Sequence, residues 1–147
     1  MFSKNKTKIQ TEDIFKLTNL TEDYNVSELV DSCLAKNKKK VINILNENRY
    51  SSDNSMEIIR TFLIKSKNIM RLSEKFHKNK NLDQTINEAK PPIFWKNKET
   101  VKKQLLNWDS NKIKEFIFDL NKIELCIKKN SYNSDKIIMN FILETAN

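Results

Sequence analysis

The amino-acid sequence predicts an all-α fold, a bundle of about seven or eight helices. Glycine is absent from the 147 residues and the only prolines are Pro91 and Pro92, so the chain lacks the residues that form tight hairpin turns. Apolar residues instead recur three and four positions apart along most of the chain, which is the spacing of one helix face. A chain of this length can bury enough apolar surface to fold without disulfide bonds or metals.

The N-terminal part is predicted to contain a tail and two helices. Residues 1–10 are polar and lysine-rich, and we expect them to be a tail or the remnant of a preceding domain, with the helical domain spanning residues 11–147. A first helix is expected at Thr11–Leu20, because a capping threonine is followed by two acidic residues in the first turn. A second is expected from about Asn25 to Lys36, with its apolar face toward the core.

The next two helices are amphipathic. A lysine cluster at residues 36–40 precedes a helix that should bury Val41, Ile42, Ile44 and Leu45. After a polar loop at residues 48–55, the longest helix is expected from about Ser55 to Phe76, because its apolar residues form one broad stripe. The opposite stripe carries Arg60, Lys67 and Arg71. We interpret it as either a solvated surface or a candidate partner face.

A short helix from about Leu82 to Ala89 is predicted to stop at the two prolines. Proline lacks a backbone N–H and moves the preceding residue out of helical geometry, so residues 93–95 are expected to be extended. These residues, Ile93, Phe94 and Trp95, are large and apolar, and leaving them in water is unfavourable. We therefore expect the linker to pack as an internal clamp between helices.

Three helices are predicted in the last third of the chain, at about Lys98–Trp108, Ser110–Asn130 and Ser134–Thr145. Glu124 lies inside the apolar stripe of the middle helix, where a carboxylate needs a partner or a place at the edge of the core. Lys128, four residues on, has the spacing of an ion-pair partner.

The residues that usually carry chemistry do not form a known motif in this sequence. Dinucleotide-binding and P-loop motifs need glycine, and Cys33 and Cys126 have neither a CxxC spacing nor a nearby histidine. The only histidine, His77, lies among lysines and is interpreted as a surface residue. We predict no catalytic residues, no cofactor, no metal and no small-molecule substrate.

The sequence predicts a cytoplasmic protein without membrane contact. We expect neither an export signal nor a membrane span, because the first residues are polar and no apolar run reaches the roughly 18 residues that a span needs; the two cysteines suit a reducing compartment.

The excess of basic residues makes nucleic acid a candidate partner. Basic residues outnumber acidic ones by 27 to 19, for a net charge of +8. Lysine clusters at 36–40, 75–80, 96–98 and 102–103 could contact a phosphate backbone weakly, and Trp95 and Trp108 could stack on bases. The periodicity, however, places both tryptophans in the core. We therefore prefer an interaction module and keep as the alternative a stand-alone, basic, helical protein that binds nucleic acid.

One stretch resembles a known family. Lys-Pro-Pro-Ile-Phe-Trp-Lys at residues 90–96, followed by Lys103-Gln104-Leu105 and Trp108, is similar to the C-terminal domain of the delta subunit of bacterial DNA polymerase III, most of all the alphaproteobacterial form. The order of helices is also similar, including Ser-Glu-Leu-Val-Asp at residues 27–31 and a long helix ending in a segment like Arg71-Leu72. The resemblance covers the chain from about Ile9 onward and less than half of a complete delta subunit.

The resemblance implies a function in assembly. In that family two N-terminal domains form an ATPase-like pair, and the first of them opens the sliding clamp. The third domain, which is helical, joins its neighbours in a circular collar, and delta itself does not hydrolyse ATP. By resemblance, the chain would oligomerise with delta-prime and the ATPase subunits of the clamp loader during DNA replication, as part of the DNA polymerase III holoenzyme.

The resemblance assigns structural roles to seven residues and catalytic roles to none. Pro91, Pro92, Phe94, Trp95 and Trp108 would fix the helix connection. Glu124 and Lys128 are similar to a Glu and a Lys of the family's penultimate helix and would tie that helix to its surroundings. Core packing is preferred over direct partner contact for all seven.

Overall fold

The computed structural model describes residues 25–47, 54–90 and 92–147. These residues form an all-α helical bundle, as predicted, and contain no strand. The predicted tail, the predicted helix at Thr11–Leu20, most of the 48–55 loop and Pro91 lie outside the described residues. None of the helices in the described part is long and apolar enough to cross a membrane.

The first described helix covers residues 25–34 and turns sharply into α2 (Lys38–Glu47). The turn requires a left-handed backbone at Lys36, whose φ is 57°. The ammonium group of Lys36 donates a hydrogen bond to the carbonyl oxygen of Thr145 (3.2 Å). This bond connects the turn to the last helix of the chain.

Helix α2 corrects two details of the sequence prediction. It starts at Lys38, inside the lysine cluster instead of after it. Val41 and Ile44 are buried and Leu45 is half-buried, but Ile42 is 39% exposed. Adjacent residues on a helix point about 100° apart, so α2 cannot turn both Val41 and Ile42 fully toward the same neighbour.

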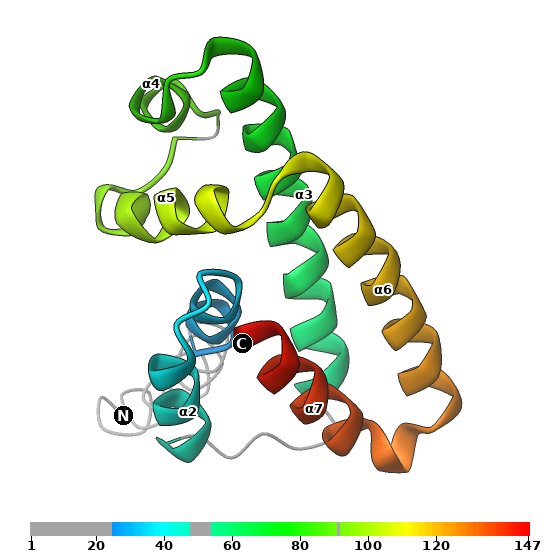
Figure 1. Cartoon of the computed structure of the whole chain (residues 1–147). Helices are drawn as coiled ribbons and strands as arrows, with labels where there is room; N and C mark the ends of the chain where they lie inside the picture. The colour runs from blue at the N-terminus through cyan, green and yellow to red at the C-terminus, as the bar shows by residue number, and fades with distance from the viewer. Residues whose placement is uncertain (1–24, 48–53, 91) are drawn as a thin grey trace, which may run out of the picture.

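Helix α3 (Ser55–Asn79) is the spine of the bundle. Helix α6 (Ser110–Lys129) runs beside it in the opposite direction for most of its length (Figure 1). Lys80 follows the last residue of α3 as its C-cap; its φ of 54° is again left-handed, and its N–H bonds to the carbonyl oxygen of Phe76. Near that end, Lys114 Nζ of α6 lies 4.0 Å from Glu74 Oε1 of α3.

Three shorter helical elements connect α3 to α6. They are α4 (Leu82–Asn87), the 3-10 turn η2 (Trp95–Asn97) and α5 (Lys98–Asn107). The side chain of Asn81 caps α4 by accepting a hydrogen bond from the Gln84 N–H (3.0 Å). Lys102 of α5 and Asp83 of α4 form an ion pair of 2.8 Å, and this hydrogen-bonded contact raises the pKa of Lys102. The pair connects α4 to α5 at the surface.

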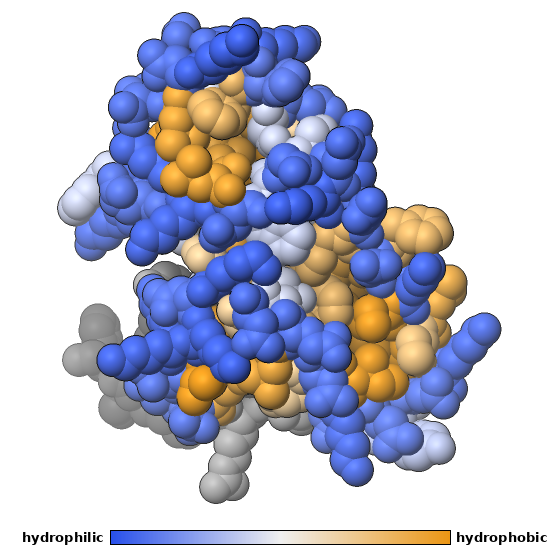
Figure 2. All heavy atoms as spheres, viewed as in Figure 1, coloured by the Kyte–Doolittle hydropathy of each residue, from blue (hydrophilic) through white to orange (hydrophobic). Residues whose placement is uncertain are grey.

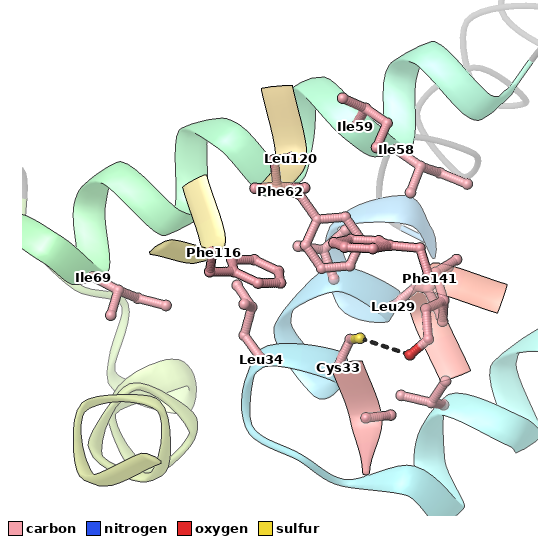
Figure 3. Packing of buried hydrophobic residues seen from close by; sticks show 14 of the residues in the cluster. Leu29, Cys33, Leu34, Ile58, Ile59, Phe62, Ile69, Phe116, Leu120 and Phe141 are labelled. Carbon is pink, nitrogen blue, oxygen red and sulfur yellow. Dashed lines mark hydrogen bonds between the residues drawn. The ribbon is translucent and has the colours of Figure 1, made fainter. Parts of the chain in front are cut away.

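The C-terminal helix closes the core. After α6, η3 (Ser131–Asn133) reverses the chain, and α7 (Ser134–Ala146) packs against α2, α3 and α6. Phe62 of α3, Phe116 of α6 and Phe141 of α7 meet there, with ring centroids 5.4, 5.5 and 6.0 Å apart (Figure 3). These separations are those of favourable aromatic pairs, so three helices share one aromatic cluster.

The predictions for α3 to α7 are confirmed closely. Each of these five helices begins at the residue that the sequence predicted, and each ends within three residues of its predicted end. Prolines and periodicity are local signals, so these bounds could be predicted without knowing how the helices pack.

Candidate interaction surface

The connection between α4 and α5 does not pack as the sequence predicted. Ile93 is half-buried against the core, but Phe94 is 57% exposed and Trp95 is 68% exposed. Pro92 is exposed as well. The prediction of an internal clamp is therefore wrong for the two aromatic residues and holds only for Ile93.

The backbone of the connection explains this outcome. Phe94 is extended, with φ −60° and ψ 135°, and successive side chains on extended backbone point to opposite sides. Because Ile93 faces the core, Phe94 faces away from it. The predicted extended segment then stops, since Trp95 begins η2, whose turn is closed by a bond from the Asn97 N–H to the carbonyl oxygen of Phe94 (2.8 Å).

Phe94 and Trp95, which we call the aromatic pair, contact each other on the surface. Their ring centroids are 5.9 Å apart. Lys96 Nζ lies 5.4 Å from the centroid of the Trp95 ring, which is within the range of a cation–π contact. Large exposed aromatic side chains are unfavourable in water and are enriched where proteins bind other molecules.

Trp108, in contrast, is the core residue that the periodicity predicted. Only 8% of it is exposed, and its indole N–H donates to the carbonyl oxygen of Leu34 (2.8 Å). Its ring centroid lies 4.7 Å from that of Phe116, and Lys36 Nζ lies 4.9 Å from it. Trp108 therefore anchors the end of α5 to the helix at residues 25–34, and its ring cannot stack on a base.

The predicted ion pair of α6 forms. Lys128 Nζ lies 3.2 Å from Glu124 Oε1, and 24% of the Glu124 side chain is exposed. The carboxylate therefore sits at the edge of the core. Both partners belong to α6, and across the described residues no ion pair joins either one to another helix.

The candidate partner face on α3 is exposed along its length. Arg60, Lys67 and Arg71 are all exposed, and so is Ile64, which is 63% exposed in the same stripe. We call these four residues the outer face of α3. The sequence analysis missed Ile64, although its position four residues after Arg60 and three before Lys67 places it there.

The outer face of α3 and the aromatic pair are part of a broader pattern. Apolar areas bordered by hydrophilic side chains lie between α4 and α5 and along α6 in the space-filling view (Figure 2). On α6 the exposed residues include Phe118 (61%) and Leu125 (59%), one heptad apart. Large apolar side chains are thus exposed on several helices.

A groove of about 360 Å³ lies between α3, α5 and the connection that leads into α5. Its floor is aliphatic and at least half-buried, and consists of Ile69, Leu72, Ala89, Ile93 and Val101. Its rim carries one aromatic and four basic side chains: Phe94, Lys65, Arg71, Lys75 and Lys90. The sequence analysis did not predict this groove, because its walls come from segments whose relative placement no local pattern encodes.

A polar network fixes one end of the groove. Lys65 Nζ of α3 lies 2.7 Å from Asp31 Oδ2, and both side chains are less than one-third exposed. Gln104 of α5 is 3% exposed and donates to the backbone carbonyl oxygen of Asp31 (3.0 Å). The network therefore joins the helix at residues 25–34 to α3 and α5. Within it, the charge of Lys65 is balanced by Asp31.

The side chains that usually carry chemistry lie apart from one another. His77 is exposed near the end of α3. Cys33 is buried, its thiol donates to the carbonyl oxygen of Ile142 (3.3 Å; Figure 3), and burial raises the pKa of this thiol to about 12. The nucleophilic thiolate is thus disfavoured at neutral pH. Throughout the described ranges, no group of three or more His, Cys, Asp or Glu residues is placed to hold a metal ion.

No protein-family model, curated protein or solved structure matches the chain. The function of this surface is therefore inferred from its own residues. What the surface can bind therefore follows from the aromatic pair, the outer face of α3 and the groove.

Proposed function

We propose that this chain is an assembly module of a bacterial clamp loader, corresponding to the C-terminal collar domain of the DNA polymerase III delta subunit. The similarity of residues 90–96, Lys103-Gln104-Leu105 and Trp108 to that family supports the proposal. An all-α bundle is also the class of fold that a collar domain has. In this proposal the chain works in the cytoplasm during DNA replication, binds delta-prime and the ATPase subunits, and contributes no catalytic residue.

The observation that supports assembly most directly is the exposure of the aromatic pair. Phe94 and Trp95 are 57% and 68% exposed, although they are among the largest apolar residues of the chain. They lie next to Ile93, which packs against the core. Aromatic residues presented in this way carry much of the binding energy of protein interfaces.

Reconstitution with the sister subunits tests the proposal. The chain is mixed with purified delta-prime and ATPase subunits, and complex formation is measured by size-exclusion chromatography with light scattering. Full-length delta serves as the positive control. We expect the chain to enter the complex, and we expect the double variant Phe94→Ala/Trp95→Ala to enter it at least about tenfold less tightly, since each hot-spot aromatic contributes about 1–2 kcal/mol or more.

Phe118→Ala is the matched control, because Phe118 is an exposed aromatic residue on a different element, α6. It should leave the affinity nearly unchanged. If the chain does not join a complex that full-length delta enters, the proposal is wrong. If the chain joins but the double variant binds equally well, the assembly surface lies elsewhere on the molecule.

The aromatic pair also supports a second candidate, nucleic-acid binding. The preference for core packing over stacking assumed that Trp95 is buried, and it is exposed, with Lys96 beside its ring. Aromatic rings next to lysines are typical of surfaces that bind single strands. This candidate predicts salt-sensitive binding of oligothymidylate that Trp95→Ala weakens and Trp95→Phe retains. Absence of salt-sensitive binding would exclude it.

A further inference from the structure

We infer that the groove between α3, α5 and the connection that leads into α5 is a docking site for an acidic, amphipathic segment of another protein, which inserts an apolar side chain between the basic residues of the rim. The inference goes beyond the proposed collar role and does not depend on it, because it needs only the groove, its charges and its floor.

The floor of the groove is suited to an apolar anchor. Ile69 and Ala89 are buried, and Leu72, Ile93 and Val101 are half-buried beside them. The volume of about 360 Å³ is at the lower end of the roughly 300–1,000 Å³ found for binding pockets. An aliphatic or aromatic side chain placed there would remove apolar surface of both molecules from water, which is favourable in proportion to the area buried.

The rim determines the charge of the occupant. Lys65 is neutralised by Asp31 at 2.7 Å. Arg71 donates to the uncharged side chain of Asn68 (2.6 Å), and among the described residues no ion pair involves Arg71, Lys75 or Lys90. Three cationic groups therefore surround an apolar floor without an internal counter-charge. Complementary charge across an interface steers association and selects the partner.

The spacing of the rim fits a helical or extended acidic segment. Arg71 and Lys75 are one turn apart on α3, on the order of 6 Å along its axis. Carboxylates one turn apart on a partner helix have the same spacing, and an apolar residue on the same face would then point at the floor. Lys90, on the opposite wall formed by the connection, can contact a further carboxylate.

The groove favours an acidic protein segment over a nucleic acid. Bases bind to flat aromatic faces, whereas the floor consists of Ile69, Leu72, Ala89, Ile93 and Val101, which are aliphatic. Bases could stack on the aromatic pair, but only Phe94 of that pair lines the groove and Trp95 does not.

The test measures binding of a defined probe to the full chain. The probe is a fluorescein-labelled amphipathic peptide of glutamate and leucine, and binding is followed by fluorescence anisotropy. Two comparison peptides replace leucine by serine or glutamate by lysine, and unlabelled oligothymidylate is added as a competitor. We expect the glutamate–leucine peptide to bind and both comparison peptides to bind at least about tenfold more weakly, since anchor and charge are both required.

Charge reversal on the rim locates the site. Lys75→Glu and Lys90→Glu should each lower the affinity for the glutamate–leucine probe by about fivefold or more. Lys78→Glu, on the same helix, and Lys103→Glu, on α5, are matched controls, because both lysines are exposed and neither lines the groove. They should change the affinity by less than about twofold. All four changes are at exposed positions, and circular dichroism confirms that each variant is folded.

Four outcomes would overturn the inference: no binding of the probe, equal binding of the serine peptide, equal weakening by the control variants, or displacement of the probe by oligothymidylate. None of them bears on the reconstitution with delta-prime and the ATPase subunits. A chain that joins the clamp loader but does not bind the probe would keep the proposed function and lose only the docking site.

Discussion

Cys33 is a thiol enclosed by the core. Its Sγ–H bonds to the carbonyl oxygen of Ile142, and burial raises its pKa from 9.0 to about 12, while the charge of the nearby Lys36 acts in the opposite direction. A raised pKa means that the folded state holds the proton more tightly than the unfolded state. The resulting stability is fully present below pH 9 and is lost as the pH rises toward 12.

We therefore predict that the free energy of unfolding decreases between about pH 9 and pH 11, and that this decrease is smaller in Cys33→Ala. Urea titrations at several pH values measure it, with the difference between the two proteins removing the contribution of lysines and tyrosines. Cys126→Ala is the control, because Cys126 is exposed. An identical pH dependence in Cys33→Ala and the unchanged protein would contradict the assigned environment of Cys33.

The two tryptophans show how far residue-level prediction reaches. Both are large, and the sequence analysis placed both in the core. Trp108 is there because it ends a helix whose neighbour presents the Leu34 carbonyl oxygen to its indole N–H. Trp95 is not, because the extended segment ends at Phe94 and Trp95 begins η2, so its side chain does not return to the side of Ile93. Hydrophobicity was known from the sequence, but the direction of one side chain was not.

At the scale of elements, the network of Asp31, Lys65 and Gln104 joins three helices that are distant in sequence. Gln104 is buried, and its amide reaches the Asp31 carbonyl oxygen at 3.0 Å. Gln84 on α4 makes a bond of similar length, 3.1 Å to Glu88, but it is exposed. The chain thus provides the same side chain in two environments.

We predict that Gln104→Ala lowers the free energy of unfolding by about 1–2 kcal/mol, because a buried hydrogen bond and packing volume are lost. Gln84→Ala should change it by less than about 0.5 kcal/mol, since water replaces an exposed bond. Urea denaturation followed by circular dichroism compares the two. Equal effects would mean that the network does not contribute to joining the helices.

The bounds of the helices were predicted better than the side-chain directions or the groove. The bounds of α3, α4, α5, α6 and α7 follow from the two prolines and from apolar periodicity, both of which act within a few residues. The groove, by contrast, could not be predicted, because its lining combines residues from 31 to 104. A pattern along the chain contains no information about which helix faces meet unless the packing is already known.

The whole molecule has a continuous core. The cluster of Phe62, Phe116 and Phe141 joins α3, α6 and α7, and Trp108 extends it toward the helix at residues 25–34 by its contact with Phe116. The buried aliphatic residues of α2 and α4 belong to the same cluster. No described helix has a core of its own.

We predict from this that the chain unfolds as a single cooperative unit. In a Trp95→Phe background, Trp108 is the only tryptophan, so its fluorescence reports on the core while far-UV circular dichroism reports on all helices. The two urea transitions should coincide. A fluorescence transition at clearly lower urea concentration would show that α5 and its surroundings unfold separately from α3 and α6.

The absence of glycine has its clearest structural consequence at Lys36 and Lys80. Both adopt left-handed backbone, which costs a residue with a Cβ on the order of 1 kcal/mol and costs glycine almost nothing. Two helix ends where glycine fits best are therefore occupied by lysine. The fold does not require a glycine-free sequence; it tolerates one, and a related chain of less biased composition is expected to carry glycine or asparagine at these two positions.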